Sequence, residues 1–322
     1  MKCLRTFLLL CFCAGALPGQ ALAAPKKLSF IPLWSPQAQF AGYYIALEKG
    51  FYRAKGLDVE ILKGGPERPA DVLLKEGKAD IGTLWLSEAI KERAHGVRLL
   101  NVAQITQRSA LMLVAKKSSD IRKLQDLDGK KVALWESFQL QPLALFRKYH
   151  LHVNVIPQAH SINLFLSGGA DAASAMIYNE YHIILNSGLN PDELTTFFFY
   201  DYGLNFPEDG IYMLEKNYNK DPAAAAAFVK ATLEGWKYAF EHKDEAVEVV
   251  LRRMREAHLP ANLMHQKWML EKMQGLIYPE GPATRAGELK RADYERVASE
   301  LARSGGWQSV AYDSFYRDCI TK

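Results

Sequence analysis

Residues 28–62 of the chain are LSFIPLWSPQAQFAGYYIALEKGFYRAKGLDVEIL. The mostly apolar segment 28–34 predicts a strand, and apolar residues on one face of 37–49 predict a helix that Gly50 ends. Apolar and charged residues then alternate through 57–62, which is typical of a second strand. A strand, a helix and a strand in this order predict a βαβ unit with parallel strands.

The same alternation continues through the first two thirds of the chain. Further strands are expected at 79–84, 97–103, 110–115, 131–135, 152–156, 172–178, 195–200 and 210–214, and helices at 70–76, 87–94, 140–148, 163–166 and 181–186. The polar joint at 116–120 is expected to be one crossing between domains, and 201–207 the return crossing. The sequence therefore predicts a first lobe of residues 24–115 and 208–322 and a second lobe of residues 116–207, each with a largely parallel sheet.

The last third of the chain is helical in pattern. Asp221 and Pro222 form a typical helix start, and helices are expected at 223–241, 244–256, 261–275 and 291–304. The predicted fold class is α/β, with two lobes, two crossings and a helical C-terminal tail.

The N-terminus has the features of a secretory signal peptide. Lys2 and Arg5 precede eleven apolar residues, 7–17, and Ala21-Leu22-Ala23 matches the small-x-small pattern that a signal peptidase cuts. Eleven residues are too few to span a bilayer, and the residues before Cys11 and Cys13 do not fit a lipobox. These features predict that residues 1–23 are a signal peptide that is cleaved near Ala23. The mature protein is then expected to be free in the periplasm, without a membrane anchor.

Composition excludes several classes of function. Removal of residues 1–23 takes away two positive charges, so the formal net charge falls from +4 to +2, which argues against a nucleic-acid partner. Removal of residues 1–23 also takes away Cys3, Cys11 and Cys13. The mature chain then keeps Cys319 alone and can form no internal disulfide. The sequence lacks the usual nucleotide-binding, hydrolase and zinc motifs, and no cofactor is expected.

His150 and His152 have the spacing of a metal pair, with His160 nearby, but a solvated loop is the preferred interpretation and no metal is predicted.

Aromatic and amide side chains recur where predicted strands end. In open α/β sheets, ligands bind beyond the carboxyl ends of the strands, and a planar heterocycle needs flat faces together with a few polar groups at its edge. Any one of these aromatics could equally fill the core, and Glu180 could simply cap a helix. The candidate ligand-binding residues are Trp34, Gln39, Tyr43, Trp85, Phe138, Gln139, Tyr178, Asn179, Glu180 and Asp201.

Residues 34–52, WSPQAQFAGYYIALEKGFY, together with GLDVE at 56–60 and GKADIG at 77–82, carry a family resemblance. The chain resembles the SsuA/THI5-like substrate-binding proteins of ABC importers, over most of its mature length. The resemblance implies a type II periplasmic-binding fold that closes on a ligand between its lobes. Relatives that bind formylaminopyrimidine use stacking aromatics and a glutamate in the second lobe, and Glu180 occupies a similar place.

Another branch of this family is the eukaryotic thiamine pyrimidine synthase, which consumes its own histidine and a lysine-bound pyridoxal phosphate. At the positions of that lysine and histidine this chain has Leu84 and Glu88, and the cysteine-rich iron motif has no counterpart between Phe197 and Met213. The leading hypothesis is a monomeric periplasmic binding protein that delivers a thiamine-precursor pyrimidine to an importer's permease and ATPase. The synthase and a ligand-sensing module remain the alternatives, and flavin precursors and sulfonates remain open as ligands.

Overall fold

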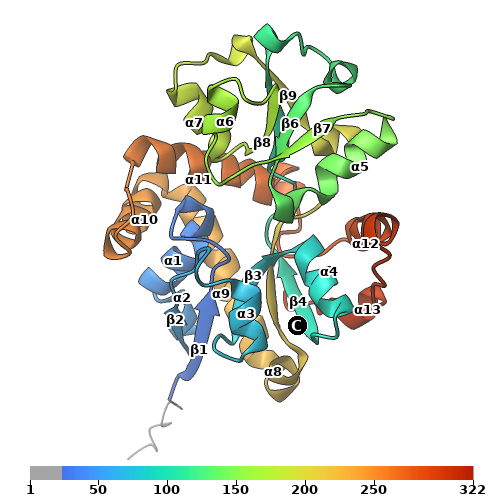
Figure 1. The fold of residues 1–322 in the computed structure, drawn as a ribbon. Coiled ribbons are helices and arrows are strands. Elements are labelled where there is room, and N and C mark those ends of the chain that lie inside the picture. The colour runs from blue at the N-terminus through green and yellow to red at the C-terminus, as the bar shows by residue number, and fades with distance from the viewer. Residues whose placement is uncertain (1–23, 322) are drawn as a thin grey trace, which may run out of the picture.

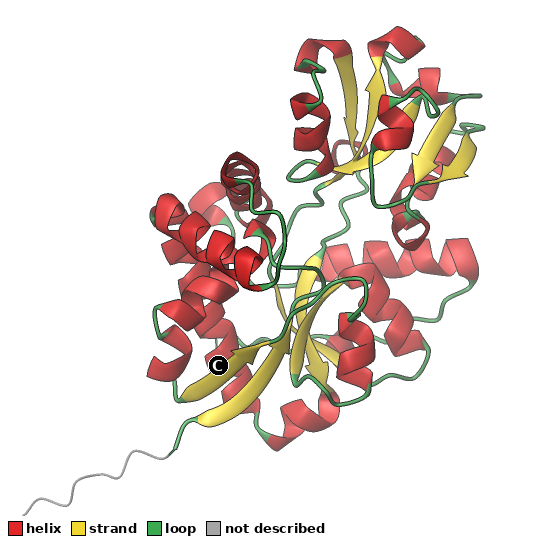
Figure 2. Ribbon diagram, turned by 60° about the vertical axis from the view of Figure 1, so that its left-hand side comes forward, coloured by secondary structure: helices red, strands yellow, loops and turns green. Residues whose placement is uncertain are grey.

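Two five-stranded sheets, joined by two crossings, form the framework of the computed structural model, which describes residues 24–321 (Figures 1 and 2). The predicted signal peptide, residues 1–23, lies outside the described residues. Within the described range, none of the helices is both long enough and apolar enough to cross a bilayer. The two-lobed α/β architecture confirms the predicted fold class.

Lobe 1 is built on a mixed sheet with the order β2-β1-β3-β10-β4. Its strands are β1 (Lys26–Ile31), β2 (Leu57–Ile61), β3 (Ile81–Trp85), β4 (Leu99–Gln104) and β10 (Asp209–Leu214). β1 is parallel to β2 and β3, with Phe30 opposite Ile81, whereas β10 is antiparallel to both of its neighbours. The sheet is largely parallel, as predicted, except for β10, which runs against the other four strands because the chain returns from lobe 2 and enters this sheet from the opposite end.

Helices cover both faces of this sheet. They are α1 (Ala41–Glu48), α2 (Phe51–Ala54), α3 (Ala70–Lys75), α4 (Leu86–Ala94), α8 (Glu215–Lys220), α9 (Pro222–Glu241), α10 (Lys243–Glu256), α11 (Leu263–Ile277), α12 (Arg291–Gly305) and α13 (Tyr312–Phe315), with 3-10 turns η1 (Ala38–Phe40) and η7 (Gly281–Ala283). The tail also reaches the other lobe, because Glu300 on α12 pairs with Arg147. The C-terminal helices therefore contact both lobes.

Lobe 2 has the sheet order β7-β6-β8-β5-β9. Its elements are β5 (Leu111–Lys116), β6 (Lys131–Leu134), α5 (Leu140–Lys148), β7 (Asn154–Pro157), α6 (Asn163–Leu166), β8 (Ala172–Met176), α7 (Glu180–Asn186) and β9 (Leu194–Phe198), with 3-10 turns η2 (Lys117–Ser119), η3 (Leu124–Leu127), η4 (Glu136–Phe138), η5 (Pro191–Glu193) and η6 (Phe199–Tyr202). β5 is antiparallel to β8 and β9. Lobe 2 is thus also a mixed sheet.

The first crossing lies earlier than the sequence predicts. The sequence predicts that the strand at 110–115 belongs to the first lobe. In the structure this strand is β5, and it pairs with β8 and β9 of the second sheet. The chain therefore changes lobes before residue 111, and the joint at 116–120 is a turn inside lobe 2. An apolar strand of this kind satisfies either sheet equally well, so its pattern does not reveal to which sheet it belongs.

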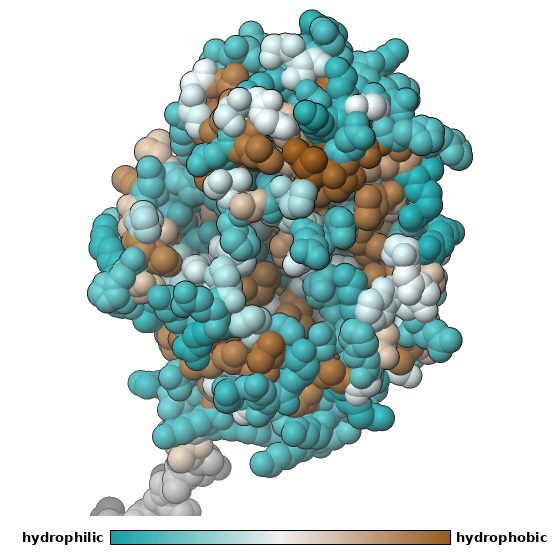
Figure 3. All heavy atoms as spheres, in the orientation of Figure 1, coloured by the Kyte–Doolittle hydropathy of each residue, from teal (hydrophilic) through white to brown (hydrophobic). Residues whose placement is uncertain are grey.

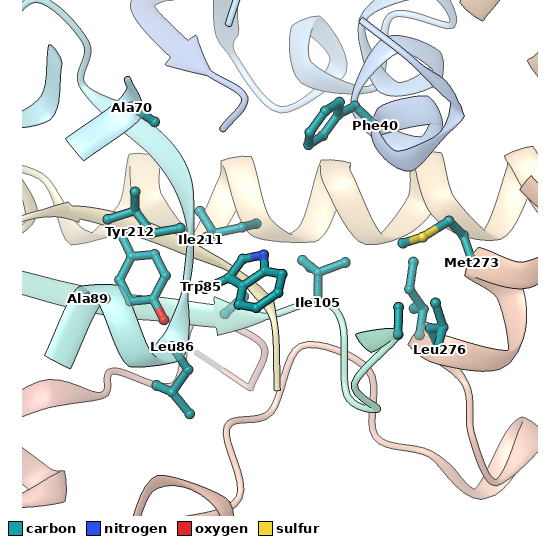
Figure 4. Close-up of a cluster of buried hydrophobic side chains, with 14 of the residues drawn as sticks. Phe40, Ala70, Trp85, Leu86, Ala89, Ile105, Ile211, Tyr212, Met273 and Leu276 are labelled. Carbon is teal, nitrogen blue, oxygen red and sulfur yellow. The ribbon is translucent and has the colours of Figure 1, made fainter. Parts of the chain in front are cut away.

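The core of lobe 1 fixes the position of α1, the helix that directly follows η1. Glycines allow α1 and α9 to approach closely: a Cβ on Gly42 would lie 2.3 Å from the ring of Trp236, and a Cβ on Gly235 would lie 2.1 Å from the backbone oxygen of Gly42. Phe30 of β1 stacks on Tyr43 of α1 with 4.5 Å between ring centroids. Figure 4 shows the same core reaching Trp85 at the end of β3, beside Ile211 of β10.

Candidate functional site

A cavity of about 390 Å³ lies between the two lobes. Its lining comes from segments that end or follow the parallel strands β1, β3, β6, β7 and β8. The lining residues are Leu33, Trp34, Gln37, Gln39 and Trp85 from lobe 1 and Trp135, Glu136, Ser137, Phe138, Gln158, His160, Met176, Tyr178, Asn179 and Glu180 from lobe 2. In the space-filling view the hydrophobic residues on this face are densest over lobe 2, and others are scattered among hydrophilic residues over lobe 1 (Figure 3). The cavity occupies the place where open α/β sheets bind ligands.

Aromatic rings from the two lobes meet at this cavity. Trp85 of lobe 1 lies 4.1 Å from Phe138 of lobe 2, measured between ring centroids and with the planes tilted by 37°. Trp34 of lobe 1 lies 5.3 Å from His160 of lobe 2. Each pair joins a ring of lobe 1 to a ring of lobe 2, so these contacts can exist only when the lobes are closed. Flat apolar faces of this kind suit an aromatic ligand.

Glu180 is the first residue of α7 and is almost completely buried, with 7% of its surface exposed. One carboxyl oxygen accepts the backbone N–H of Met176 at 3.0 Å, and the other accepts the side-chain amide of Asn179 at 2.7 Å. Burial raises the pKa of Glu180, while these hydrogen bonds oppose that rise. Because a carboxylate has about four acceptor positions, both oxygens can accept further donors from the cavity.

A chain of amides connects the opposite wall to a second buried carboxyl. Gln37 donates to the side-chain oxygen of Gln39 at 2.5 Å, and Gln39 donates to Asp209 at 2.7 Å. Asp209 begins β10, and burial raises its pKa to about 7. This carboxyl holds the Gln39 nitrogen, and therefore turns the Gln39 oxygen toward Gln37 at the cavity wall.

A third buried carboxyl, Glu208, joins the two crossings. It accepts hydrogen bonds from the Ser109 hydroxyl and from the backbone N–H groups of Ala110 and Leu111, all at one oxygen. Burial and the neighbouring Asp209 raise the pKa of Glu208 to about 8. Burial, followed by the charges of these two carboxyls and Glu180, also raises the pKa of Tyr178, so three acidic side chains act on this lining residue, and one of them, Glu180, itself lines the cavity.

Seven of the ten candidate residues line the cavity: Trp34, Gln39, Trp85, Phe138, Tyr178, Asn179 and Glu180. Their contacts with a ligand stay a prediction. Tyr43, Gln139 and Asp201 do not line it. Tyr43 is buried between Phe30 and Trp236. Gln139 is the N-cap residue before α5, one residue beyond the lining, and Asp201 is an exposed residue of η6 in the second crossing. The proposals below are therefore built on the seven lining residues.

The structure adds lining residues that the list of candidates omitted. Trp135 and Met176 lie at the ends of β6 and β8, so the position of aromatics and apolar residues at strand ends could have identified them. Gln158 and His160 follow β7, whose short and exposed strand gives a weak signal. His160 is a ring partner of Trp34, and among the described residues no group of three or more His, Cys, Asp or Glu side chains could hold a metal ion.

Comparison with known proteins gives relatives of two kinds. The chain is 25% identical to the formylaminopyrimidine-binding protein of Halalkalibacterium halodurans over 77% of each chain, and 26% identical to a putative thiamine biosynthesis protein of Haemophilus influenzae over 88% of each. It is 30% identical to a 4-amino-5-hydroxymethyl-2-methylpyrimidine phosphate synthase of Saccharomyces cerevisiae, but over only 33% of this chain and 32% of the synthase.

The fold is that of a solved binding protein. The periplasmic aliphatic sulphonate-binding protein SsuA of Escherichia coli superposes with a TM-score of 0.69 at 17% identity, covering 89% of this chain and 95% of SsuA. The family model described as "NMT1/THI5 like" matches residues 37–246. That match includes β3, all of lobe 2 and β10, and with them nearly the whole lining of the cavity. The chain belongs to the NMT1/THI5-like family.

Proposed function

We propose that this protein is the substrate-binding component of an ABC importer, and that it captures a thiamine-precursor aminopyrimidine by closing its lobes around the ring. The observation that carries the proposal is the buried Glu180 carboxyl at the edge of a cavity walled by aromatic rings. The formylaminopyrimidine-binding relative supports the ligand class, and the likeness to SsuA supports the fold.

The edge of an aminopyrimidine matches a carboxyl group. It presents an exocyclic amine, which donates, beside a ring nitrogen, which accepts or carries a proton. An ionised Glu180 accepts from the amine and from a protonated ring nitrogen, whereas a neutral Glu180 accepts from the amine and donates to the bare nitrogen. In both protonation states two hydrogen bonds form, so the raised pKa of Glu180 does not disturb recognition.

The charge of the cavity separates this ligand from a sulfonate. The lining contains two carboxyl side chains, Glu136 and Glu180, and within the described part of the chain it contains no lysine or arginine. A sulfonate is always anionic and would be repelled by these groups. This protein resembles SsuA in fold, but it is therefore not expected to bind the same kind of ligand.

The same lining opposes the synthase activity. Leu84 and Glu88 are not lining residues, and Glu88 forms an ion pair with Lys91 on α4. Since no lysine of the described chain lines the cavity, no Schiff base with pyridoxal phosphate is expected there. We propose that the protein is not an enzyme, and that it acts as a monomer in the periplasm together with a permease and an ATPase.

Isothermal titration calorimetry tests the proposal, with 4-amino-5-hydroxymethyl-2-methylpyrimidine as the probe and riboflavin and an alkanesulfonate as comparison ligands. The aminopyrimidine is expected to bind and the sulfonate is not. Glu180→Ala should weaken binding about tenfold to a hundredfold, because a hydrogen bond to a charged group contributes about 1.5–3 kcal/mol. Glu60→Ala removes an exposed carboxylate of β2 and is the control.

Two results would overturn the proposal. One is binding of the sulfonate in preference to the aminopyrimidine, and the other is unchanged affinity in the Glu180→Ala protein. Incubation with pyridoxal phosphate, followed by mass spectrometry, tests the enzyme directly, because a covalent mass increase on a lysine would favour the synthase.

A further inference from the structure

Helices α7 and α11 face each other across the closed lobes, beside the cavity, whose lining includes only the first residue of α7, Glu180. α11 belongs to the C-terminal tail and packs on lobe 1, where Gln266 accepts the backbone N–H of Ala38 at 2.8 Å. Its Trp268 donates to the backbone oxygen of Ile177 in lobe 2 at 2.9 Å. Figure 1 shows α11 directly below α7. α11 lies beyond residues 37–246, so the family match says nothing about it.

Two histidines form the centre of this contact. Nδ1 of His182, on α7, lies 2.9 Å from Nδ1 of His265, on α11. The ring of His182 also stacks on Trp268, with 4.9 Å between centroids and 17° between planes. One of the two nitrogens donates a proton and the other accepts it, so the pair forms a hydrogen bond only while at least one ring is neutral.

The histidine pair continues into the candidate site. Nε2 of His265 lies 2.8 Å from the side-chain oxygen of Asn179, whose nitrogen donates to Glu180 at 2.7 Å. Since the Asn179 nitrogen faces a carboxylate, its oxygen accepts from His265, which therefore carries its proton on Nε2. A neutral His265 then accepts at Nδ1, and His182 donates from Nδ1. The side-chain nitrogen of Asn186 lies 3.2 Å from the same His182 Nδ1, and in this tautomer, where that Nδ1 carries its proton, it makes no hydrogen bond to it.

We propose that His265 is a positioning residue for the ligand-binding carboxyl Glu180, and that the His182–His265 hydrogen bond makes lobe closure, and hence ligand binding, depend on a neutral His265. This inference rests on the proposed function, in which Glu180 contacts the ligand. It assigns to the C-terminal tail a part in binding. The tail completes the site only when the lobes are closed, since α11 and α7 belong to different lobes.

The surroundings of the pair favour its neutral form. Burial, and then the charge of His182, lower the pKa of His265 from its ordinary 6.5 to about 4, and burial lowers the pKa of His182. On α7, Tyr181 contacts the ring of Trp268, and Glu180 reaches the pair only through Asn179. Lys272 lies over the Trp268 ring. From α10, Asp244 is occupied by an ion pair with Lys267. η1, which also packs on α11, contributes Ala38, Gln39 and Phe40, none of which titrates.

The pH dependence of affinity follows from these values. When the lobes open, His265 regains its ordinary pKa of 6.5 and takes up a proton that the closed form excludes. Acidification therefore favours the open, weakly binding form. Between pH 7.5 and 5.5 this single group lowers the affinity about tenfold, and His182 acts in the same direction.

Calorimetry with the same aminopyrimidine at pH 7.5 and 5.5 separates the roles. His265→Gln places an amide nitrogen where Nε2 stands but does not titrate, so we expect near wild-type affinity at pH 7.5 and loss of the tenfold decrease. His265→Ala should weaken binding at both values, because Asn179 loses its donor. His152→Gln, which removes a side chain that is 92% exposed, is the control and should keep the wild-type profile.

A pH profile of His265→Gln that matches the wild type would overturn the proposal, and so would equal losses of affinity in His265→Gln and His265→Ala at both pH values. Glu180 can also change its protonation state beside the ligand, but it is present in every variant and cancels from the comparison.

Imidazole ¹⁵N spectra distinguish failure of this inference from failure of the proposed function. If the wild type binds no aminopyrimidine, the proposed function fails, and spectra of the chain closed on the comparison ligand that does bind decide the inference. A neutral His265 protonated on Nε2, beside a His182 protonated on Nδ1, is the expected result. The opposite tautomers, or two independent titrations near 6.5, would overturn it.

Discussion

Replacement of Asp209 by asparagine is expected to remove a large part of the pH dependence of folding stability. The Asp209 carboxyl is buried at the start of β10, accepts one hydrogen bond from Gln39, and has a second oxygen, Oδ1, that is buried without a partner. Asparagine keeps an oxygen for Gln39 but carries no charge. The substitution therefore isolates the cost of ionising a carboxyl in the core.

The magnitude follows from linkage between proton binding and folding. The pKa of Asp209 is about 7 in the folded protein and has an ordinary value of 3.8. Between these values the folded chain keeps a proton that the unfolded chain has released, so stability falls as the pH rises. From pH 5 to pH 8 this group lowers the free energy of unfolding by about 2.6 kcal/mol. Asp209→Asn should not show this loss.

Urea unfolding at pH 5, 6, 7 and 8 measures the effect. The wild type should lose stability across this range relative to Asp209→Asn, and most of the difference should develop between pH 5 and 7. Asp58→Asn, which removes an exposed carboxylate from β2, should follow the wild type. Parallel curves for the wild type and Asp209→Asn would show that the Asp209 carboxyl is not protonated in the folded protein, and the reasoning would fail.

Two further predictions concern packing. In Gly235→Ala the new Cβ would lie 2.1 Å from the backbone oxygen of Gly42, so α1 and α9 would have to separate, and urea unfolding should show a loss of about 1–3 kcal/mol. Gly275→Ala adds the same group to α11 where no atom lies within 4 Å, and it should instead gain about 0.5–1 kcal/mol from helix propensity. Trp85→Ala removes the ring that meets Phe138 across the lobes, so calorimetry should show about tenfold weaker aminopyrimidine binding. Unchanged affinity in that variant would mean that the two rings do not enclose the ligand.

Most of the fold follows from local pattern. Strand and helix periodicity, together with caps such as Asp221, locate the elements closely, and the helices at 140–148 and 163–166 have the predicted bounds. The direction of a strand, and the sheet to which it belongs, are harder to predict from the sequence. β5 and β10 are apolar strands like their neighbours, and only the path of the chain between lobes determines that they run antiparallel.

The candidate site shows the same division. Strand ends can be recognised in the sequence, and they lead to Trp34, Trp85 and Glu180. Tyr43 lies outside the lining, and its position could not be predicted, because residues 41–46 of α1 are all buried and helical periodicity does not show which face meets the cavity. His265 gives no local signal at all, since its partner Asn179 lies 86 residues away in the chain.

The position of β10 between β3 and β4 sets an order of assembly. The sheet of lobe 2 uses a continuous stretch, residues 111–198, and can form as soon as that stretch is available. Lobe 1 lacks a middle strand until residues 209–214 arrive, and its partial sheet meanwhile has open edges on β3 and β4. A nascent or truncated chain that ends before residue 209 therefore has one finished lobe and one lobe prone to pair with other chains.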